Sequence, residues 1–337
     1  MNSTFIRKFY NKKTVAITGA SGFIGHHLVK GLVNQGCKVR ALVKYNSQSN
    51  IGLLQTLDSD TLKHVEIEFG TVCDLRMMEK FVCDTDVVFH LAALIGIPYS
   101  YVAPMDYIQV NTVGTLNILE AVRRFGIPRL IVTSTSETYG SAQYVPMDEL
   151  HPLQAQSPYS ASKISADQLA LSYYRSFNTP VTIIRPFNVF GPKQSLRAVI
   201  PTIILQMLKN KHSITVGSRF PVRDFTYVTD VVNGFIRMGC MKNVEGNIFN
   251  TATGVGVSIN DIIDTVRSLV GYKGRVISTD ERIRPEKSEV TRLIGSAKKA
   301  KETLGWVPKV SLQEGLKSAI DHFENTISNK DVSRYAI

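Results

Sequence analysis

A short strand, a glycine-rich turn and a helix lie close to the start of the chain, and this combination constrains the fold more than any other feature. Residues 14–18 are rich in β-formers, and the amphipathic segment after the turn runs to about residue 35. Glycines allow a tight turn and close backbone approach, and the N-terminus of the helix attracts phosphate charge. The pattern predicts a dinucleotide site, although a glycine triplet also fits a purely structural turn. The residues expected to bind the cofactor there are Gly19, Ser21, Gly22, Phe23, Ile24 and Gly25.

The second strand is expected at residues 38–43, and no acidic residue follows it. An Asp or Glu at that point would bind the ribose hydroxyls of NAD. No Asp or Glu precedes Asp58, whereas residues 1–57 contain eight Lys or Arg. A cation without a carboxylate suits the 2′-phosphate of NADP, so NADP is favoured over NAD; a solvated Lys44 beside a plain ribose is the alternative. The residues expected at this end of the cofactor are Lys44, Asn46 and Ser47.

Three further strands are expected at residues 64–69, 86–93 and 129–134. With the first two strands they predict an α/β protein built on a Rossmann-type, doubly wound parallel sheet. His90 is expected to be packed or hydrogen-bonded at its strand end, without a chemical role. The helix that opens at Asn111 runs towards residue 125. Further cofactor contacts are expected from Asp74, Leu75, Leu91, Ala92, Ala93 and Asn111.

A tyrosine and a lysine four residues apart form a candidate redox pair. Tyr159 and Lys163 share one face of a helix expected at residues 157–177. A nearby ammonium lowers the pKa of a phenol, and a phenolate can accept a hydroxyl proton while hydride leaves the same carbon. Two unrelated side chains on a helix surface are the ordinary alternative, so the assignment depends on the surrounding motifs.

A carboxylate stands close to this pair at the end of the strand expected at residues 129–134. The segment is Thr135-Ser136-Glu137, and ligands bind at the carboxyl edge of doubly wound sheets. A tyrosine and lysine alone indicate hydride transfer, whereas an added carboxylate indicates that a carbon-bound proton is also removed. Oxidation, elimination and reduction in one site are therefore expected. The candidate catalytic residues are Thr135, Ser136, Glu137, Tyr159 and Lys163.

Composition excludes several other classes of protein. The 337 residues are 44% hydrophobic and 20% charged, which is ordinary for a globular fold, and no apolar run reaches the ~18 residues of a membrane span. The four cysteines have neither metal-ligand nor disulfide spacing, so no metal site and a cytoplasmic location are expected. The net charge of +11 keeps a nucleic-acid binder in view, but the basic residues form no recognisable module. A nucleotide-binding sensor without catalysis is expected to lack part of the Tyr/Lys/Glu set, which is complete here.

Further motifs are distributed over about residues 12–326. They include His90-Leu91-Ala92-Ala93, Arg185-Pro186-Phe187-Asn188, Arg284-Pro285-Glu286 and Leu304-Gly305-Trp306. As a set, the motifs resemble the extended short-chain dehydrogenase/reductases of the NAD(P)-dependent nucleotide-sugar epimerase/dehydratase family. The resemblance implies a Rossmann domain over residues 12–185. It also implies a smaller mixed α/β substrate-binding domain over residues 186–326, from which some chain returns to the first domain, and a polar tail at 327–337.

The segment from Thr135 to Lys163 most closely resembles the 4,6-dehydratases of legionaminic acid biosynthesis. That resemblance implies conversion of an NDP-hexose, UDP- or GDP-N-acetylglucosamine, to the NDP-4-keto-6-deoxy sugar by internal hydride transfer from C4 to C6. The cofactor is then expected to stay tightly bound and to be recycled in each turnover. A UDP-sugar 4-epimerase and a UDP-glucuronate decarboxylase remain alternatives. Epimerases usually carry a small or apolar residue where Glu137 stands, whereas decarboxylases share the Ser-Glu pair.

The second half of the chain supplies the expected substrate contacts. Arginine pairs with phosphate through two parallel hydrogen bonds, so arginines are expected on the substrate diphosphate. A solvated surface charge is the alternative, and it stays open above all for Arg197. The resemblance also implies a homodimer in which the helices at 111–125 and 159–177 form a four-helix bundle, with neither nucleic acid nor membrane as a partner. The candidate substrate-binding residues are Asn188, Arg197, Arg223, Arg284 and Glu286.

Overall fold

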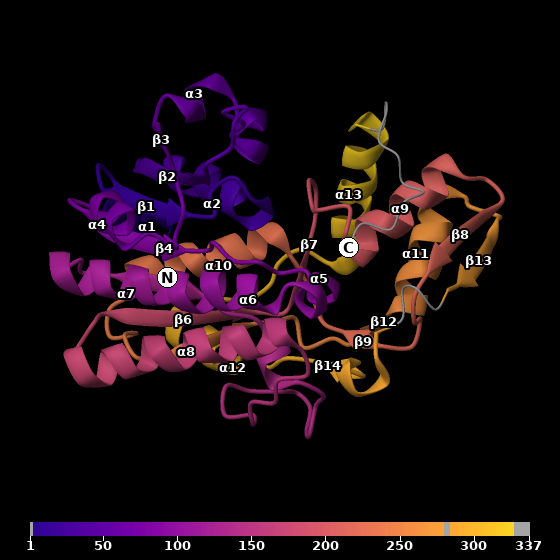
Figure 1. Cartoon of the computed structure of the whole chain (residues 1–337). Helices are drawn as coiled ribbons and strands as arrows, with labels where there is room; N and C mark the ends of the chain where they lie inside the picture. The colour runs from indigo at the N-terminus through magenta and orange to yellow at the C-terminus, as the bar shows by residue number, and fades with distance from the viewer. Residues whose placement is uncertain (1–2, 280–283, 327–337) are drawn as a thin grey trace.

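The computed structural model describes residues 3–279 and 284–326, and a seven-stranded parallel sheet lies at its centre (Figure 1). The strands are β1 (Thr14–Thr18), β2 (Lys38–Lys44), β3 (Val65–Gly70), β4 (Val87–His90), β5 (Leu130–Thr133), β6 (Val181–Pro186) and β11 (Ile248–Thr251). Their order is β11-β6-β5-β4-β1-β2-β3. The chain thus winds outward in both directions from β1, and the strand order reverses between β1 and β4, where doubly wound sheets bind their ligands.

Helices cover both faces of the sheet. They are α2 (Phe23–Val33), α4 (Leu75–Val82), α7 (Gly114–Phe125), α8 (Pro158–Phe177) and α10 (Val228–Cys240). α2 and α10 pack together over one face, whereas α4, α7 and α8 cover the other (Figure 1). Val15 and Ile17 of β1 enter the first core and Ala16 enters the second, because successive side chains of a strand point to opposite faces.

The predicted fold class is confirmed, and most predicted elements begin and end within two residues of the observed ones. α8 begins at Pro158 because the Ser157 side chain accepts a hydrogen bond from the Ser160 backbone N–H. Two boundaries were wrong. The strand predicted to reach residue 93 ends at His90. The Leu91 and Ala92 backbone N–H groups both bond to Thr18, the last residue of β1, so the ladder between the two strands goes no further. The helix predicted from residue 111 starts earlier, in a π-helical turn η2 (Ile108–Val113).

A smaller mixed α/β part lies beyond the carboxyl edge of the sheet (Figure 1). In it β7 (Asn188–Phe190) pairs with β10 (Phe225–Tyr227), and β8 (Ser213–Val216) pairs with β13 (Arg275–Ser278). β9 (Val222–Arg223) lies between β12 (Val257–Ser258) and β14 (Arg292–Leu293). Its helices are α9 (Val199–Lys209), α11 (Ile259–Val270) and α13 (Leu312–Thr326). α10, β11 and α12 (Lys298–Leu304) return to the large sheet, and the predicted tail at 327–337 lies outside the described residues.

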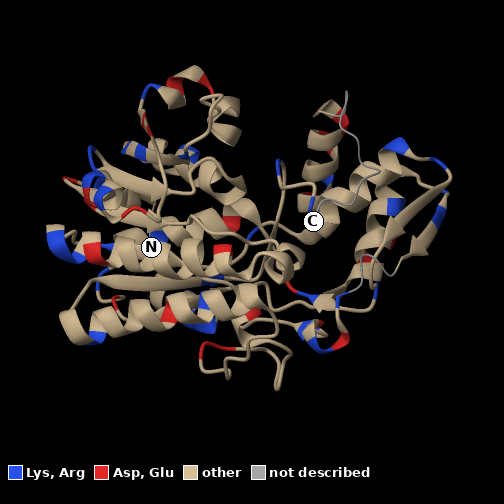
Figure 2. Ribbon diagram, viewed as in Figure 1, with Lys and Arg blue, Asp and Glu red and all other residues tan. Residues whose placement is uncertain are grey.

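Several short helical elements follow the carboxyl ends of the strands or lie in the smaller part. After β2 come η1 (Gly52–Thr56) and α3 (Ser59–Leu62), and after β4 come α5 (Ile97–Val102) and α6 (Pro104–Tyr107). η3 (Ser136–Tyr139) follows β5, and η5 (Glu286–Ser288) lies in the smaller part. Figure 2 shows Lys and Arg scattered over both parts of the fold and interspersed with Asp and Glu. Within residues 3–279 and 284–326, no helix has the length and apolar character needed to cross a membrane.

An additional helix, α1 (Ser3–Tyr10), closes the amino-terminal edge of the sheet. Ile6 and Tyr10 are buried, and the Tyr10 hydroxyl donates a 2.8 Å hydrogen bond to the Ile236 carbonyl of α10. Lys13, just after the helix, pairs with Asp86 at 2.8 Å, at the start of β4. α1 is therefore fixed to both a helix and a strand of the core.

Tyr10→Phe should lower the free energy of unfolding by about 1 kcal/mol, because it removes one buried hydrogen bond and leaves the ring in place. Denaturant unfolding of both proteins measures the difference. Phe5→Leu is the matched control on the same helix, since Phe5 is 47% exposed, and it should change stability by less than about 0.5 kcal/mol. Equal losses in the two variants would mean that the Tyr10 hydrogen bond does not stabilise the attachment of α1.

Candidate active site

The turn between β1 and α2 is packed backbone against backbone. Gly19 has a φ of +70°, and a Cβ there would lie 2.7 Å from the backbone nitrogen of Ala92. A Cβ on Gly25 would lie 2.1 Å from the Gly19 carbonyl oxygen. Gly22, the N-cap of α2, offers no side chain to the free N–H groups of the first helical turn. These features fit a pyrophosphate, which needs close backbone approach and the N-terminus of a helix.

The loop after β4 faces this turn and is held by Thr18. The Thr18 hydroxyl accepts 3.1 Å hydrogen bonds from the backbone nitrogens of Leu91 and Ala92. His90 bonds to Thr18 through Nδ1 (2.8 Å) and to Thr115 through Nε2 (3.1 Å). Burial, with a smaller effect from the Lys163 charge, lowers the pKa of His90 to about 3. His90 is therefore packed and hydrogen-bonded at its strand end, as predicted, and its lowered pKa favours the neutral imidazole.

Asn111 is fully buried and joins the same loop to α8. Its side chain accepts a hydrogen bond from the Leu94 nitrogen (2.8 Å) and donates to the Leu94 carbonyl (3.0 Å) and the Ser162 hydroxyl (2.9 Å). The amide is thus engaged within the protein. Its predicted contact with the cofactor stays a prediction, and what the structure shows is that Asn111 positions the loop of the other predicted contacts.

The residues predicted at the adenosine end follow β2 and β3. Lys44 and Ser47 are exposed, whereas the Asn46 side chain accepts a 2.8 Å hydrogen bond from the Asn50 nitrogen and so organises its own loop. Asp74 caps α4 by accepting from Met77 at 3.2 Å, and the adjacent Leu75 is partly exposed. Lys44 is a solvent-exposed cation at the end of β2, while the cofactor contacts themselves stay predictions.

The candidate redox pair occupies the first two turns of α8. Lys163 is buried and donates a 2.6 Å hydrogen bond from Nζ to the Thr133 carbonyl at the end of β5. Burial lowers the pKa of Lys163 to about 8, and the charge of Asp167 opposes that shift. The lysine therefore titrates close to the neutral range rather than near its usual value.

Tyr159 packs edge-on against Tyr107, with ring centroids 6.2 Å apart. Burial raises the pKa of Tyr159 well above its ordinary value, and a hydrogen bond with Thr135 opposes that shift only in part. The expectation that this pKa is lowered overall is therefore wrong. Desolvation by burial outweighs the contributions that favour the phenolate.

Glu137 lies in η3 and is fixed from both sides. Its backbone nitrogen donates to the Thr135 hydroxyl at 3.2 Å, and its carbonyl accepts a 2.6 Å hydrogen bond from Ser160 on α8. The side chain is 12% exposed, and its Oε2 lies 3.8 Å from Nη1 of Arg284. Its charge also contributes to the raised pKa of Tyr159. The structure therefore brings Thr135, Glu137, Tyr159 and Lys163 together, whereas Ser136 is only 2% exposed.

Two of the predicted substrate arginines lie near this carboxylate. Arg223 of β9 is buried and pairs with Glu289 at 3.2 Å. Burial lowers its pKa, and the charge of Glu137 opposes the shift. Nη1 of Arg284 is buried and has no hydrogen-bond partner among the described residues, since its contact with Glu137 is an ion pair without a hydrogen bond. An anion would therefore compete with Glu289 for Arg223, whereas Arg284 has a donor beside Glu137 that no described residue uses.

The other predicted substrate residues lie farther from the centre of this cluster or are more exposed. Asn188 begins β7 and is half-buried, and Glu286 is exposed at the start of η5. Arg197 is exposed. Burial raises the pKa of Tyr107, the ring that packs on Tyr159, and the Arg197 charge opposes that shift. Their substrate contacts stay predictions.

Sequence reasoning missed a set of hydrogen bonds that fasten the Arg284 segment in place. Gln156 donates to the backbone carbonyls of Lys287 (3.1 Å) and Glu289 (3.3 Å), and it accepts from the Ser141 nitrogen at 2.6 Å. The Ser288 hydroxyl lies 2.5 Å from that of Tyr101 on α5. These pairs are separated by up to 187 residues, and no local pattern signals them.

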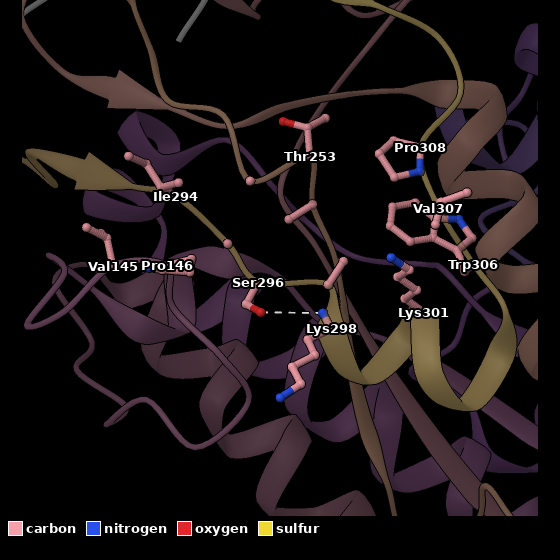
Figure 3. Close-up of a pocket in the computed structure, with 14 residues that line it drawn as sticks. Val145, Pro146, Thr253, Ile294, Ser296, Lys298, Lys301, Trp306, Val307 and Pro308 are labelled. Atoms are coloured by element: carbon pink, nitrogen blue, oxygen red, sulfur yellow. Dashed lines mark hydrogen bonds between the residues drawn. The ribbon is translucent and has the colours of Figure 1, made fainter.

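A cavity of about 480 Å³ lies away from these residues (Figure 3). Val145 and Pro146, the segment at residues 252–254, and the region from Ile294 to Pro308 line it, and none of the predicted site residues is among them. Within the described part of the chain, no three His, Cys, Asp or Glu side chains gather in an arrangement that could hold a metal ion.

Residues 16–319 match the family described as GDP-mannose 4,6 dehydratase. A putative UDP-glucose 4-epimerase of Methanocaldococcus jannaschii is 32% identical over 318 residues, which is 92% of this chain and 98% of the relative. The dTDP-D-glucose 4,6-dehydratase of Homo sapiens is 29% identical over 325 residues, 94% of this chain and 91% of the relative. The solved structure of MoeE5 in complex with UDP-glucuronic acid and NAD superposes with a TM-score of 0.82 at 28% identity, over 93% of this chain and all of that one.

Gly25→Ala should weaken dinucleotide binding at least about tenfold, because the new Cβ meets a backbone oxygen that cannot yield without moving the turn. Isothermal titration with NAD and NADP measures the change. Gly96→Ala is the matched control, since its Cβ would meet only ordinary contacts at 3.6 Å or more and should leave the affinity unchanged. Unaltered affinity in Gly25→Ala would place the pyrophosphate elsewhere.

Proposed function

The chain belongs to the extended short-chain dehydrogenase/reductase family of NAD-dependent nucleotide-sugar dehydratases and epimerases, and we propose that it is a nucleotide-sugar 4,6-dehydratase. The proposed substrate is an NDP-hexose, UDP- or GDP-N-acetylglucosamine, and the product is the NDP-4-keto-6-deoxy sugar. The resemblance of the segment from Thr135 to Lys163 to the dehydratases of legionaminic acid biosynthesis supports the N-acetylated sugar.

One observation carries the proposal: Glu137 is a largely buried carboxylate placed beside Tyr159 at the carboxyl edge of the sheet. The Ser160 and Thr135 hydrogen bonds fix its backbone relative to α8, and its charge acts on Tyr159. A simple hydride transfer needs only the tyrosine and lysine. A second group that can accept a proton permits removal of a carbon-bound hydrogen in the same site.

The proposed reaction begins at the sugar 4-OH. Tyr159 is the proposed acceptor of its proton. A dinucleotide held at the turn from Gly19 to Gly25 would supply the hydride acceptor for C4 and the hydride donor for C6. The Thr135 hydroxyl opposes the rise in the pKa of Tyr159 that burial causes, and the Lys163 ammonium is proposed to stabilise the phenolate as well. The 4-ketone makes the C5 hydrogen acidic, so Glu137 removes it as a proton. Ser136 is almost fully buried, so Glu137 is the group proposed to pass that proton to the C6 oxygen, which leaves as water. When hydride returns to C6, C5 takes a proton from Glu137, which solvent has reprotonated. The proton that Tyr159 took from the 4-OH is released to solvent, so the net change is the loss of one water.

Arg284 is proposed to link substrate binding to this chemistry. Before substrate binds, its guanidinium pairs with Glu137 and offers a buried Nη1 without a hydrogen-bond partner among the described residues. A diphosphate is a stronger partner for arginine than a single carboxylate at 3.8 Å. Once Arg284 binds the diphosphate, Glu137 is free to act as a base. Arg223 is the second proposed diphosphate contact because it lies beside the same carboxylate.

The homodimer implied by the resemblance also remains a proposal. Each of the two helices concerned, α7 and α8, ends in a partly exposed aromatic residue, Phe125 and Phe177. Exposed aromatic rings near two adjacent helices are compatible with a partner subunit on this side of the sheet.

A second candidate function is 4-epimerisation. The Methanocaldococcus jannaschii relative, at 32% identity, is a putative UDP-glucose 4-epimerase. In addition, a permanent ion pair with Arg284 would prevent Glu137 from acting as a base. An epimerase uses Tyr159 and the cofactor as above but returns hydride to C4, so no water is lost.

The experiment that separates these functions is mass spectrometry after incubation of the enzyme, without added reductant, with UDP- and GDP-N-acetylglucosamine, GDP-mannose and UDP-glucuronate. Loss of one water from an N-acetylglucosamine nucleotide supports the proposal and names its base. Loss of carbon dioxide from UDP-glucuronate would identify a decarboxylase. An unchanged mass with altered sugar resonances in the NMR spectrum would identify an epimerase.

Glu137→Gln should still oxidise the substrate at C4 but should eliminate water about 10²–10⁴-fold more slowly, because the base is lost and the redox pair is kept. Reduced cofactor should therefore accumulate, which absorbance detects in a single turnover. Tyr159→Phe is the comparison: it should lose both cofactor reduction and product formation. Normal dehydration by Glu137→Gln would remove the carboxylate from the mechanism.

We also propose NADP as the preferred cofactor, since no acidic residue follows β2 and Lys44 is exposed at its end. Lys44→Ala should weaken NADP binding by about fivefold, the size expected of an exposed ion pair, and leave NAD binding unchanged. Titration of the cofactor-free protein with each dinucleotide at low salt measures both. Equal effects on the two, or no effect on either, would contradict a role of Lys44 at the 2′-phosphate.

A further inference from the structure

A buried carboxylate that the proposed reaction does not use lies one helical turn after the catalytic lysine. Asp167 of α8 is fully buried, and its Oδ2 accepts three hydrogen bonds. The donors are Oγ of Ser134 (2.8 Å) and both Nε (3.0 Å) and Nη2 (2.8 Å) of Arg185 on β6. Oδ1 is also buried but has no hydrogen-bond partner among the described residues.

The Arg185–Asp167 ion pair leaves one carboxylate oxygen without a hydrogen-bond donor among the described residues. Arginine usually binds a carboxylate through two parallel hydrogen bonds, one to each oxygen. Here both guanidinium nitrogens of Arg185 bond to the same oxygen of Asp167, and the other oxygen keeps its share of the charge without any donor. A charge left in this way in a low-dielectric interior acts on every nearby cation, and here it acts on Lys163 as well as on Arg185.

Asp167 is joined to the site by the backbone as well. Ser134, its hydrogen-bond donor, lies between two residues of the catalytic cluster. Thr133 accepts the Lys163 ammonium at its carbonyl, and Thr135 bonds to Tyr159 and to the Glu137 nitrogen. The Ser134–Asp167 hydrogen bond therefore fixes α8 to the end of β5 at the point where the lysine is bound.

Other titratable groups surround this position. They are titratable side chains that interact with Lys163, Tyr159 or Asp167, or with Arg185. They are Tyr159 of α8, His90 of β4, Glu137 and Tyr139 of η3, Tyr107 of α6 and Arg185 of β6. His90 is neutral, and burial raises the pKa of Tyr139 to about 12 and that of Tyr107 above its usual value. Among these groups Asp167 is the one whose charge favours the protonated lysine.

We propose that Asp167 is a positioning residue that keeps Lys163 protonated and bound to the Thr133 carbonyl, so that the lysine can support the phenolate of Tyr159. Arg185 bonds to the same carboxylate and therefore weakens the stabilisation that Asp167 gives to the protonated lysine. The inference rests on the roles proposed for Tyr159 and Lys163. It does not depend on which sugar is bound or on whether water leaves.

The test is a direct titration of Lys163 in the full-length protein with its bound cofactor. Lysine labelled with ¹³C at the ε carbon is followed by NMR, and Lys163→Met assigns the resonance. In the natural protein Lys163 should titrate at about pH 8. In Asp167→Asn it should titrate about one to two units lower, since the opposite charge is gone and the burial remains. Unchanged titration in a folded Asp167→Asn protein would overturn the proposal.

Ser134→Ala is the matched control, because it removes one hydrogen bond from Asp167 and no charge. It should lower stability slightly and leave the Lys163 titration where it is. If Asp167→Asn does not fold, Arg185→Gln gives a test of opposite sign. Loss of the competing cation should move the Lys163 titration upward, and a downward shift or no shift would contradict the proposal.

Activity gives a second readout. A neutral lysine cannot support the phenolate, so cofactor reduction should fall as pH rises through the Lys163 pKa. In Asp167→Asn this alkaline limb should begin at lower pH, whereas a purely structural role would lower the rate equally at all pH values. The NMR titration holds even if the substrate proves to be epimerised. A failure of the proposed function and a failure of this inference are therefore distinguishable.

Discussion

The active site depends on one constraint, the common carboxyl edge of three neighbouring parallel strands. The register places Thr18 of β1 beside His90 of β4, and His90 beside Val132 of β5. The residues that follow these positions must therefore leave the sheet together. Gly19 begins the turn proposed to bind the cofactor, Leu91 begins the loop that faces it, and the Thr133 carbonyl accepts a hydrogen bond from Lys163. Tyr159 and Glu137 are placed relative to this edge by hydrogen bonds of α8 and η3.

Local sequence patterns predicted most of the strands and helices around the site. A strand, a glycine turn and an amphipathic helix are each determined largely by a few adjacent residues. The strand at 14–18 and the helix carrying Tyr159 are examples. The sequence could not show which segments desolvate a given side chain. Tyr107, 52 positions before Tyr159, encloses its ring, and the resulting rise in pKa reverses the expectation based on Lys163 alone. Gln156 and Asp167 escaped notice for the same reason, since their partners lie on distant elements.

The positive charge near the site is largely balanced within the protein. Arg185 pairs with Asp167, Arg223 with Glu289, and Arg284 with Glu137. The net charge of +11 therefore says little about the electrostatic field in the site. Under the proposed function, the substrate diphosphate would replace Glu289 at Arg223 and Glu137 at Arg284. Such exchange favours selectivity over raw affinity, because an anion that cannot replace the carboxylate's contacts gains nothing from the arginines.

The hydrogen bonds around Gln156 join the two ends of the substrate region. Gln156 immediately precedes the N-cap of α8, and it also holds the carbonyls of Lys287 and Glu289 beside Arg284. A displacement of the arginine segment is thus transmitted to the first turn of the helix that carries Tyr159. Under the proposed function, binding of the nucleotide at Arg284 is then coupled through Gln156 to the position of Tyr159 relative to the sugar. If Arg284 binds the diphosphate as proposed, binding energy gained there raises the turnover rate as well as the affinity, and a sugar without its nucleotide should be a slow substrate even at saturation.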